Sequence, residues 1–285
     1  DATIIATGCY VEGLDEEAAG ELNCDRLIDN AHKNEIVAQA EKIAITKMGK
    51  HVRADVKIED GCNQFCSYCI IPYRRGRISC RPQESIIREV SQLAATGHKE
   101  IVLAGIHISS YGRDELAGLI RSIGDIEGIE RVRLGSLEPR LIDEKFLEGL
   151  RGVRQFCPHF HLSLQSGCDK TLKAMNRHYT TDEFRRGVEL IRSCWEHPAI
   201  TTDVIAGFPG ESREDFEISK AFTDEMRFYQ MHIFPYSRRK GTAADRMPGQ
   251  LTMAEKQKRV DELEEIPELA QMVLQRHTRE DDAML

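Results

Sequence analysis

Three closely spaced cysteines give this chain its clearest chemical signal. Cys62, Cys66 and Cys69 stand in a C-x3-C-x2-C spacing within the string DGCNQFCSYC, and a basic run follows them. Three thiolates on one loop can hold one face of an iron–sulfur cube, whereas a complete [4Fe–4S] site uses four cysteines. The spacing therefore predicts a cluster with one iron open to another ligand, and an open metal position is typical of a catalytic site.

Two other uses of these cysteines stay open on the residues alone. A zinc site requires a fourth Cys or His, and the nearest candidates, Cys80 and His51, fit no usual ligand spacing. A disulfide requires an oxidising compartment, and no apolar signal-like stretch opens the chain. Nine cysteines without such a stretch favour metal or thiol chemistry in the cytoplasm.

The charge of the chain bears on its partners. A net charge of −8 argues by itself against a nucleic-acid partner. Basic residues nevertheless gather in two short groups, which are either solvated faces or RNA contacts. The candidates for RNA contact are Arg74, Arg75, Arg77, Arg238, Arg239 and Lys240. No run of about 18 apolar residues is present, so the sequence predicts no membrane span.

From Ala54 onward the sequence repeats the pattern strand, loop, helix six times. The expected strands are 54–59, 100–104, 131–135, 159–164, 201–206 and 228–234, and the expected helices are 83–95, 115–123, 143–150, 181–194, 212–225 and 253–273. Repeated β/α units predict a parallel sheet with right-handed crossovers, and six are too few for an eight-stranded barrel. We therefore expect an α/β fold with an open, partial (β/α)6 TIM-like barrel over residues 51–250 and a C-terminal helix within 251–285.

The first 50 residues are expected to be the remnant of a small α/β domain. Strands are expected at 3–7 and 26–28, and helices at 14–22 and 34–43. The chain opens on Asp1 rather than on a methionine, which suggests a fragment of a longer protein.

Unusual residues follow the ends of the expected strands, where parallel β/α folds place their chemistry. The cysteine loop follows the first strand, residues 105–107 follow the second and residues 136–138 the third. The string QSG, from Gln165, follows the fourth, and GFPGE, from Gly207, follows the fifth. Each loop alone can be an ordinary turn, but their shared edge predicts one site.

The longer string GCNQFCSYCIIPYRRG resembles the methylthiotransferase branch of the radical S-adenosylmethionine (SAM) enzymes. The resemblance implies that SAM binds the open iron. An electron donor such as flavodoxin or ferredoxin then reduces the cluster, and SAM splits into methionine and a 5′-deoxyadenosyl radical. The family adds a methylthio group, whose methyl also comes from SAM, to a base of the tRNA anticodon stem-loop or to an aspartate of a small-subunit ribosomal protein. LAGIHISSYG, RLGSLEPR and HIFPYSRRKGT look most like the enzymes that modify N6-threonylcarbamoyladenosine, with the N6-isopentenyladenosine enzymes as the alternative.

The same resemblance assigns contacts to SAM. It places them at Tyr68, Ile71, Gly105, His107, Ser136, Glu138, Gln165, Asp203 and Gly207. Two of these have another interpretation, because His107 can be a loop histidine bonded to backbone and Asp203 a carboxylate in an ion pair. The string LKAMNR, which ends at Arg177, also matches the family but has no assigned role.

Both ends of the chain depart from the family pattern. Family members hold a second [4Fe–4S] cluster on three N-terminal cysteines, of which Cys9 matches the third, and the other two would precede residue 1. The RNA-binding TRAM β-barrel that closes the family is not found before Leu285. We therefore expect one cluster in this chain and keep a second interpretation open, a truncated domain that only cleaves SAM or binds RNA.

Overall fold

The computed structural model describes residues 52–269 of the chain, together with positions 5–7, 11, 14, 18, 22, 24, 26–29 and 32. Near the N-terminus, β1 (Ile5–Thr7) pairs in parallel with β2 (Arg26–Ile28), and both lie where the sequence places strands. Cys9 and the expected helix 34–43 fall outside the described residues, as does most of the expected helix 14–22.

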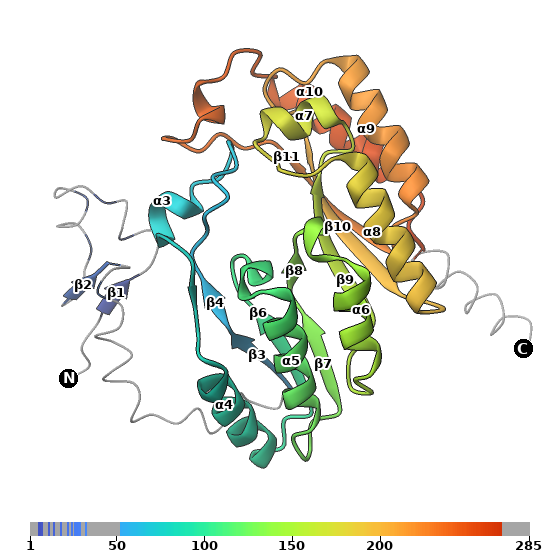
Figure 1. The fold of residues 1–285 in the computed structure, drawn as a ribbon. Helices are drawn as coiled ribbons and strands as arrows, with labels where there is room; N and C mark the ends of the chain where they lie inside the picture. The colour runs from blue at the N-terminus through green and yellow to red at the C-terminus, as the bar shows by residue number, and fades with distance from the viewer. Residues whose placement is uncertain are drawn as a thin grey trace, which may run out of the picture.

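A curved parallel sheet forms the core, as Figure 1 shows. One part runs β3–β6–β7 and the other β8–β9–β10–β11. The bounds are β3 (Arg53–Lys57), β6 (Glu100–Ala104), β7 (Arg131–Leu134), β8 (Ser136–Leu137), β9 (His159–Gln165), β10 (Ala199–Ala206) and β11 (Gln230–Pro235). A bridge between Val132 and Phe156 joins the two parts. Because β3 and β11 are edge strands, the sheet is the open, partial barrel that the repeated β/α units predict.

Helices follow the strands, and α6, α8, α9 and α10 begin at Asp, Thr or Ser residues whose side chains cap them. Thr180 and Glu183 form a capping box at the start of α8, and Ser212 and Asp215 form another at the start of α9. The long helices are α4 (Gln83–Ala95), α5 (Arg113–Gly124), α6 (Glu144–Arg151), α8 (Thr181–Cys194), α9 (Arg213–Met226) and α10 (Met253–Glu264). None of the described helices has both the length and the apolar composition needed to cross a membrane.

Along β9, side chains that face the hydrophobic core alternate with side chains that face the inside of the barrel. On β9, Phe160, Leu162 and Leu164 are fully buried in the apolar cluster shared with the helices. His161 and Ser163, between them, are only half-buried. Side chains of adjacent strand residues point to opposite faces, so the second set faces the inside of the barrel.

Several boundaries differ from those expected by one or two residues, and three differences change the description of the fold. The first strand ends at Lys57, and a separate two-residue strand, β4 (Glu59–Asp60), pairs antiparallel with β5 (Ser79–Cys80). The third strand is interrupted at Gly135, which separates β7 from β8. Helix α10 ends at Glu264 rather than at residue 273, because Pro267 disfavours helical backbone at the residue before it.

Candidate functional site

The cysteine loop is closed at its base by the β4–β5 pair. Glu59 lies opposite Cys80 and Asp60 opposite Ser79, so the chain leaves and re-enters this ribbon around residues 61–78. Gly61 makes the tight exit possible. Its φ is +82°, and a Cβ there would lie 2.2 Å from the Arg77 carbonyl oxygen.

The three predicted cluster ligands converge in this loop as free thiols. Cys62 and Cys66 are buried and Cys69 is half-buried. Burial is the largest cause of the raised pKa of Cys62 and of Cys69, and the nearby charge of Cys66 raises both further. A metal centre bound here must therefore displace thiol protons, as thiolate ligands require.

The separation of the three sulfurs bears on whether one metal ion could bind all of them. Two sulfurs on one tetrahedral zinc lie roughly 3.8 Å apart. Among the described residues, only one group of three or more Cys, His, Asp or Glu brings its ligand atoms within 4.8 Å of one another, and it contains none of these cysteines. The three sulfurs therefore do not all meet this criterion for one shared ion, and a cubane cluster does not require it, because each cysteine binds a different iron.

The string LKAMNR holds the cysteine loop in place. Ser67 donates its N–H to Met175 O at 2.9 Å and its hydroxyl to Ala174 O at 2.9 Å. Arg177 Nη1 lies 3.3 Å from Cys66 Sγ, while Nη2 donates to Ser163 O at 3.3 Å. The string had no assigned role in the sequence, and here it positions the loop and supplies a positive charge beside one thiol.

Asn176 adds two further bonds, and its replacement should weaken the loop. Its amide donates to Gln64 O at 3.3 Å and to Phe65 O at 3.0 Å, with φ at +57°, where Asn is tolerated better than Ala. We expect Asn176→Ala to lower the free energy of unfolding by about 2–3 kcal/mol, from two lost bonds and left-handed backbone. Asn176→Gly should lose about 1 kcal/mol less, since glycine adopts this backbone freely. Equal losses in urea denaturation would contradict the backbone part of this account.

Beside the cysteines, a polar group joins the ends of three strands. His107 Nε2 lies 3.0 Å from Glu138 Oε2, and Gln64 Nε2 donates to the same oxygen at 3.1 Å. The His107 N–H donates to buried Glu59 at 2.7 Å. The ring of His107 is therefore bonded to a carboxylate rather than to backbone. A Cβ on Gly105 would lie 2.8 Å from Glu59 Oε2, so glycine is what lets this carboxyl approach.

The two carboxyls of this group have opposite pKa shifts. Burial raises the pKa of Glu59, and the His107 N–H lowers it by less. Burial also acts to raise the pKa of Glu138, but the hydrogen bond and charge of His107, with the charge of Arg177, lower it by more. Glu138 is therefore an anionic group close to the cysteines, suited to an ammonium or a ribose hydroxyl.

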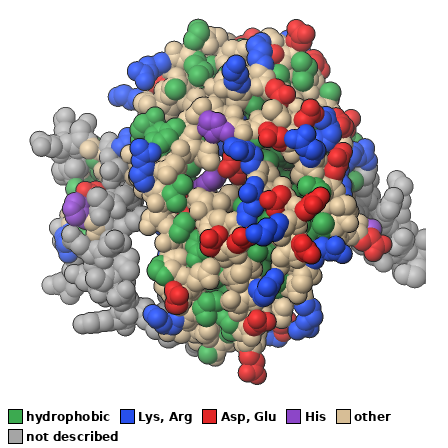
Figure 2. All heavy atoms as spheres, in the orientation of Figure 1, with side chains coloured by type: hydrophobic (Ala, Val, Ile, Leu, Met, Phe, Trp, Pro, Cys, Tyr) green, Lys and Arg blue, Asp and Glu red, His purple; other side chains and the backbone are tan. Residues whose placement is uncertain are grey.

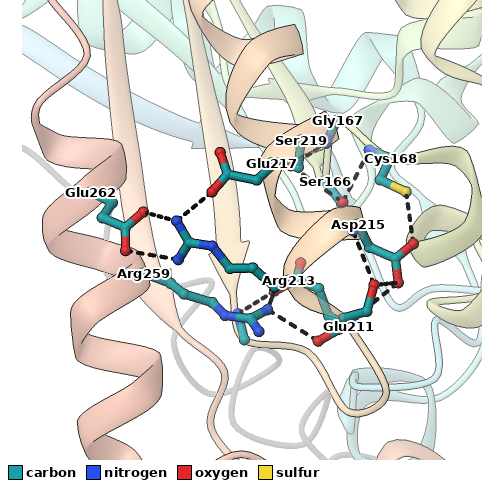
Figure 3. Close-up of polar contacts among 12 residues, drawn as sticks. Ser166, Gly167, Cys168, Glu211, Arg213, Asp215, Glu217, Ser219, Arg259 and Glu262 are labelled. Carbon is teal, nitrogen blue, oxygen red and sulfur yellow. Dashed lines mark hydrogen bonds and ion pairs between the residues drawn. The ribbon is translucent and has the colours of Figure 1, made fainter.

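The loop after β10 is fixed by a buried ion pair (Figure 3). Glu211 accepts the Gly207 N–H at 3.0 Å and pairs with Arg259 of α10. A Cβ on Gly207 would lie 2.7 Å from the side chain of Lys256. The next residue, Phe208, belongs to a small apolar cluster against which Tyr68 packs, so this loop adjoins the cysteine loop.

The remaining predicted SAM contacts are placed less closely together. Gln165 is buried at the end of β9 with φ at +66°, a backbone often found at functional sites. Ile71 begins α3 (Ile71–Arg75), and Ser136 is exposed on β8. Asp203 lies inside the barrel, 3.2 Å from His161, so the ion pair considered for it is present.

The two basic groups lie on the same rim. Gly241, after the group 238–240, faces the Ile70 side chain, and Ala244 donates to Ser67 O at 2.8 Å. Residues 238–240 are exposed, although Arg238 also pairs with Asp245 at 3.0 Å. In the first group, Arg75 lies 3.3 Å from Asp60, and the Arg77 guanidinium lies 5.0 Å from the centre of the Phe65 ring.

Known proteins resemble this chain in sequence over most of its length. The Radical SAM superfamily profile matches residues 56–222. The threonylcarbamoyladenosine tRNA methylthiotransferase MtaB of Chlamydia pneumoniae is 38% identical over 95% of this chain and 69% of its own length. This chain belongs to the radical SAM methylthiotransferases. The tRNA-2-methylthio-N(6)-dimethylallyladenosine synthase of Thermoanaerobacter sp. (strain X514) is 42% identical over 77% of the chain.

Solved structures support the fold of this methylthiotransferase chain. Coproporphyrinogen III oxidase (HemN) from Escherichia coli, a radical SAM enzyme, matches 79% of the chain and 54% of its own with a TM-score of 0.61 at 17% identity. The methyltransferase TsrM from Kitasatospora setae gives 0.56 at 20% identity over 67% of the chain and 38% of its own. The chain spans 69% and 48% of the two curated relatives above.

The residues of this methylthiotransferase chain fit a [4Fe–4S] cluster and SAM. Three free thiols converge in a ribbon-closed loop, the half-buried guanidinium of Arg177 contacts one of them, and an anionic carboxyl lies beside them. Sequence reasoning missed Glu59, Gln64 and Asn176 as parts of the site. The signal for Asn176 was the unexplained match at LKAMNR.

Proposed function

We propose that this chain is the catalytic core of a tRNA methylthiotransferase that modifies C2 of N6-threonylcarbamoyladenosine beside the anticodon. The observation that carries the proposal is the loop of Cys62, Cys66 and Cys69, held by Arg177 and closed by β4–β5. The two curated relatives differ in the base that they are named for, and the match to the threonylcarbamoyladenosine enzyme extends over more of this chain. N6-isopentenyladenosine is the second candidate.

In this proposal the three thiolates hold a cluster with one open iron, which binds SAM. When bound, the reduced cluster and SAM supply the radical that removes hydrogen from C2, a C–H bond that ordinary bases do not deprotonate. Glu138, held by His107 and Gln64, orients the polar parts of SAM. Tyr68 and the Gly207 loop cover the adenine and exclude water, while Gly105, Gln165, Ile71 and Ser136 complete the walls. Cys9 is proposed as a ligand of a second cluster in the longer protein.

The test uses the anaerobically reconstituted chain. We expect about four irons and a spectrum that changes when SAM is added. With reductant, SAM and added sulfide as the sulfur source, the longer protein that also supplies the second cluster should add one methylthio group to tRNA carrying N6-threonylcarbamoyladenosine, measured by nucleoside mass spectrometry. Product only from tRNA carrying N6-isopentenyladenosine would contradict the assigned base. SAM cleavage without product from either tRNA would leave only the SAM-cleaving interpretation.

The exposed basic group at residues 238–240 is proposed to contact the tRNA backbone. Each phosphate contact contributes about −0.9 to the slope of log K against log salt, or about −0.7 for single strands. Arg239→Ala combined with Lys240→Ala should therefore make this slope less steep by about 1.4–1.8. The matched control replaces Arg121 and Arg151, exposed on α5 and α6, with alanine and should keep the slope. An equal change in both double variants would mean that only net charge matters.

A further inference from the structure

A second group of polar side chains lies inside the barrel, on strands β9, β10 and β11. His161, Asp203 and His232 come from these three neighbouring strands. Asp203 is paired in register with His232, and Thr201, two residues earlier on β10, is paired with His161. The same face of a sheet therefore carries all three side chains, on a scaffold of backbone hydrogen bonds.

The three side chains converge on one point. His161 Nε2 lies 3.2 Å from Asp203 Oδ2, and the rings of His161 and His232 have their centres 5.8 Å apart. One ligand atom from each of the three residues lies within 4.8 Å of the other two. No other such group of three exists among the described residues.

His161 is held in the orientation that a metal ligand needs. Its Nδ1 lies 2.9 Å from the hydroxyl of Thr201, which is buried. In the tautomer in which Nδ1 donates this bond, the Nε2 lone pair faces the Asp203 carboxylate and is free to bind a metal ion, whereas in the other tautomer the Nε2–H donates to Asp203. A proton can bridge only two of the three side chains, whereas a metal ion can bind all three. A hydrogen-bonded second nitrogen is the usual support of a metal-binding histidine.

We propose that His161, Asp203 and His232 bind a divalent metal ion inside the barrel, separate from the cysteine-bound cluster. Two ligands about 2.1 Å from one ion, at about 90–110° to each other, lie roughly 3.0–3.4 Å apart. The 3.2 Å between His161 and Asp203 falls in this range. Two imidazoles and one carboxylate suit Fe²⁺, Mn²⁺ or Zn²⁺.

The site can exchange ligands with the solvent. His232 is exposed, and it lies on β11, the strand at the open edge of the barrel. Figure 2 shows histidine and basic side chains around a hollow near the centre of one face of the molecule. Three protein ligands leave further coordination positions open, to be filled by oxygen ligands such as water.

The test uses Mn²⁺, which binds nitrogen and oxygen ligands in preference to thiolates, and the cluster-loaded chain. The loss of the free Mn²⁺ signal in electron paramagnetic resonance measures binding. We expect about one Mn²⁺ per chain, with affinity reduced more than 10-fold in Asp203→Asn and in His161→Gln. Thr201→Val should weaken binding about 10-fold through His161.

The matched control is His159→Gln, because His159 lies on the same strand and bonds Thr201 at 3.3 Å but is outside the group. This variant should bind Mn²⁺ like the unmodified chain. Iron content and circular dichroism confirm that each variant is folded and loaded. Absence of Mn²⁺ binding would overturn the proposal and leave a protonated ion pair. Unchanged binding in Asp203→Asn and His161→Gln would overturn it too, since the ion would then lie elsewhere.

Discussion

Each of the single variants Cys62→Ala, Cys66→Ala and Cys69→Ala is expected to lose the cluster and all SAM cleavage. Three cysteines bind three of the four irons and leave one iron open. Removal of any one cysteine would leave two irons without a protein ligand. After anaerobic reconstitution, iron should fall from about four per chain to well below one. Iron and sulfide analysis with visible absorbance measures this, and deoxyadenosine formation measures cleavage.

The matched control for the cysteine variants is Cys80→Ala. Cys80 lies at the end of the same loop, paired with Glu59 in the ribbon, but its thiol is exposed and directed toward Ser110 O at 3.9 Å. This variant should keep its iron and its SAM cleavage. Comparable iron loss in Cys80→Ala would show that the ribbon, rather than ligand number, limits loading. Full iron in any of the three ligand variants would overturn the assignment of that cysteine.

Arg259→Met is expected to lower the free energy of unfolding by about 3–5 kcal/mol, because it leaves the Glu211 carboxylate buried without its partner. The Glu211 side chain is 2% exposed and that of Arg259 is 10% exposed. Arg259 also donates to Glu211 O at 3.2 Å. Since Glu211 holds the Gly207 N–H, the change should also disorder the loop beside Tyr68. Urea denaturation of the reconstituted chain measures the loss.

Arg213→Met provides the control for this effect. Both guanidiniums stack on Phe216, that of Arg213 5.0 Å and that of Arg259 5.2 Å from the ring centre (Figure 3 shows both arginines). Arg213 pairs with Glu262 at 2.6 Å, but its side chain is 53% exposed. Stability close to that of the unmodified chain is expected, because water screens exposed pairs. Similar losses in the two variants would mean that stacking on Phe216, not burial of the charge pair, is the cause.

Local sequence signals were sufficient for most of the fold. Helices α4 and α8 and strand β6 have the predicted bounds, since each combines a clear hydrophobic period with a definite start. The divided third strand was not foreseeable. Gly135 allows it, as its missing Cβ would lie 3.2 Å from Leu103 O, but that contact exists only once β6 is alongside.

The residues of the candidate site also fall into those that a local sequence pattern predicts and those that it does not. Cluster ligands were identified because their spacing is local in the chain. Arg177 contacts Cys66 across 111 positions, and no local pattern encodes such a contact. Glu59 was missed because the strand was expected to continue through it, while its burial depends on the β4–β5 ribbon and on Gly105.

The bonds that hold the cysteine loop also set the order in which the protein matures. All three cysteines have been synthesised by residue 69, but the groups that shape their loop belong to residues 174–177 and to Ala244. A ribosome therefore exposes three unconstrained thiols long before the chain can form their binding surface. Iron loading must follow the folding of most of the barrel, and until then the nascent thiols depend on a reducing environment.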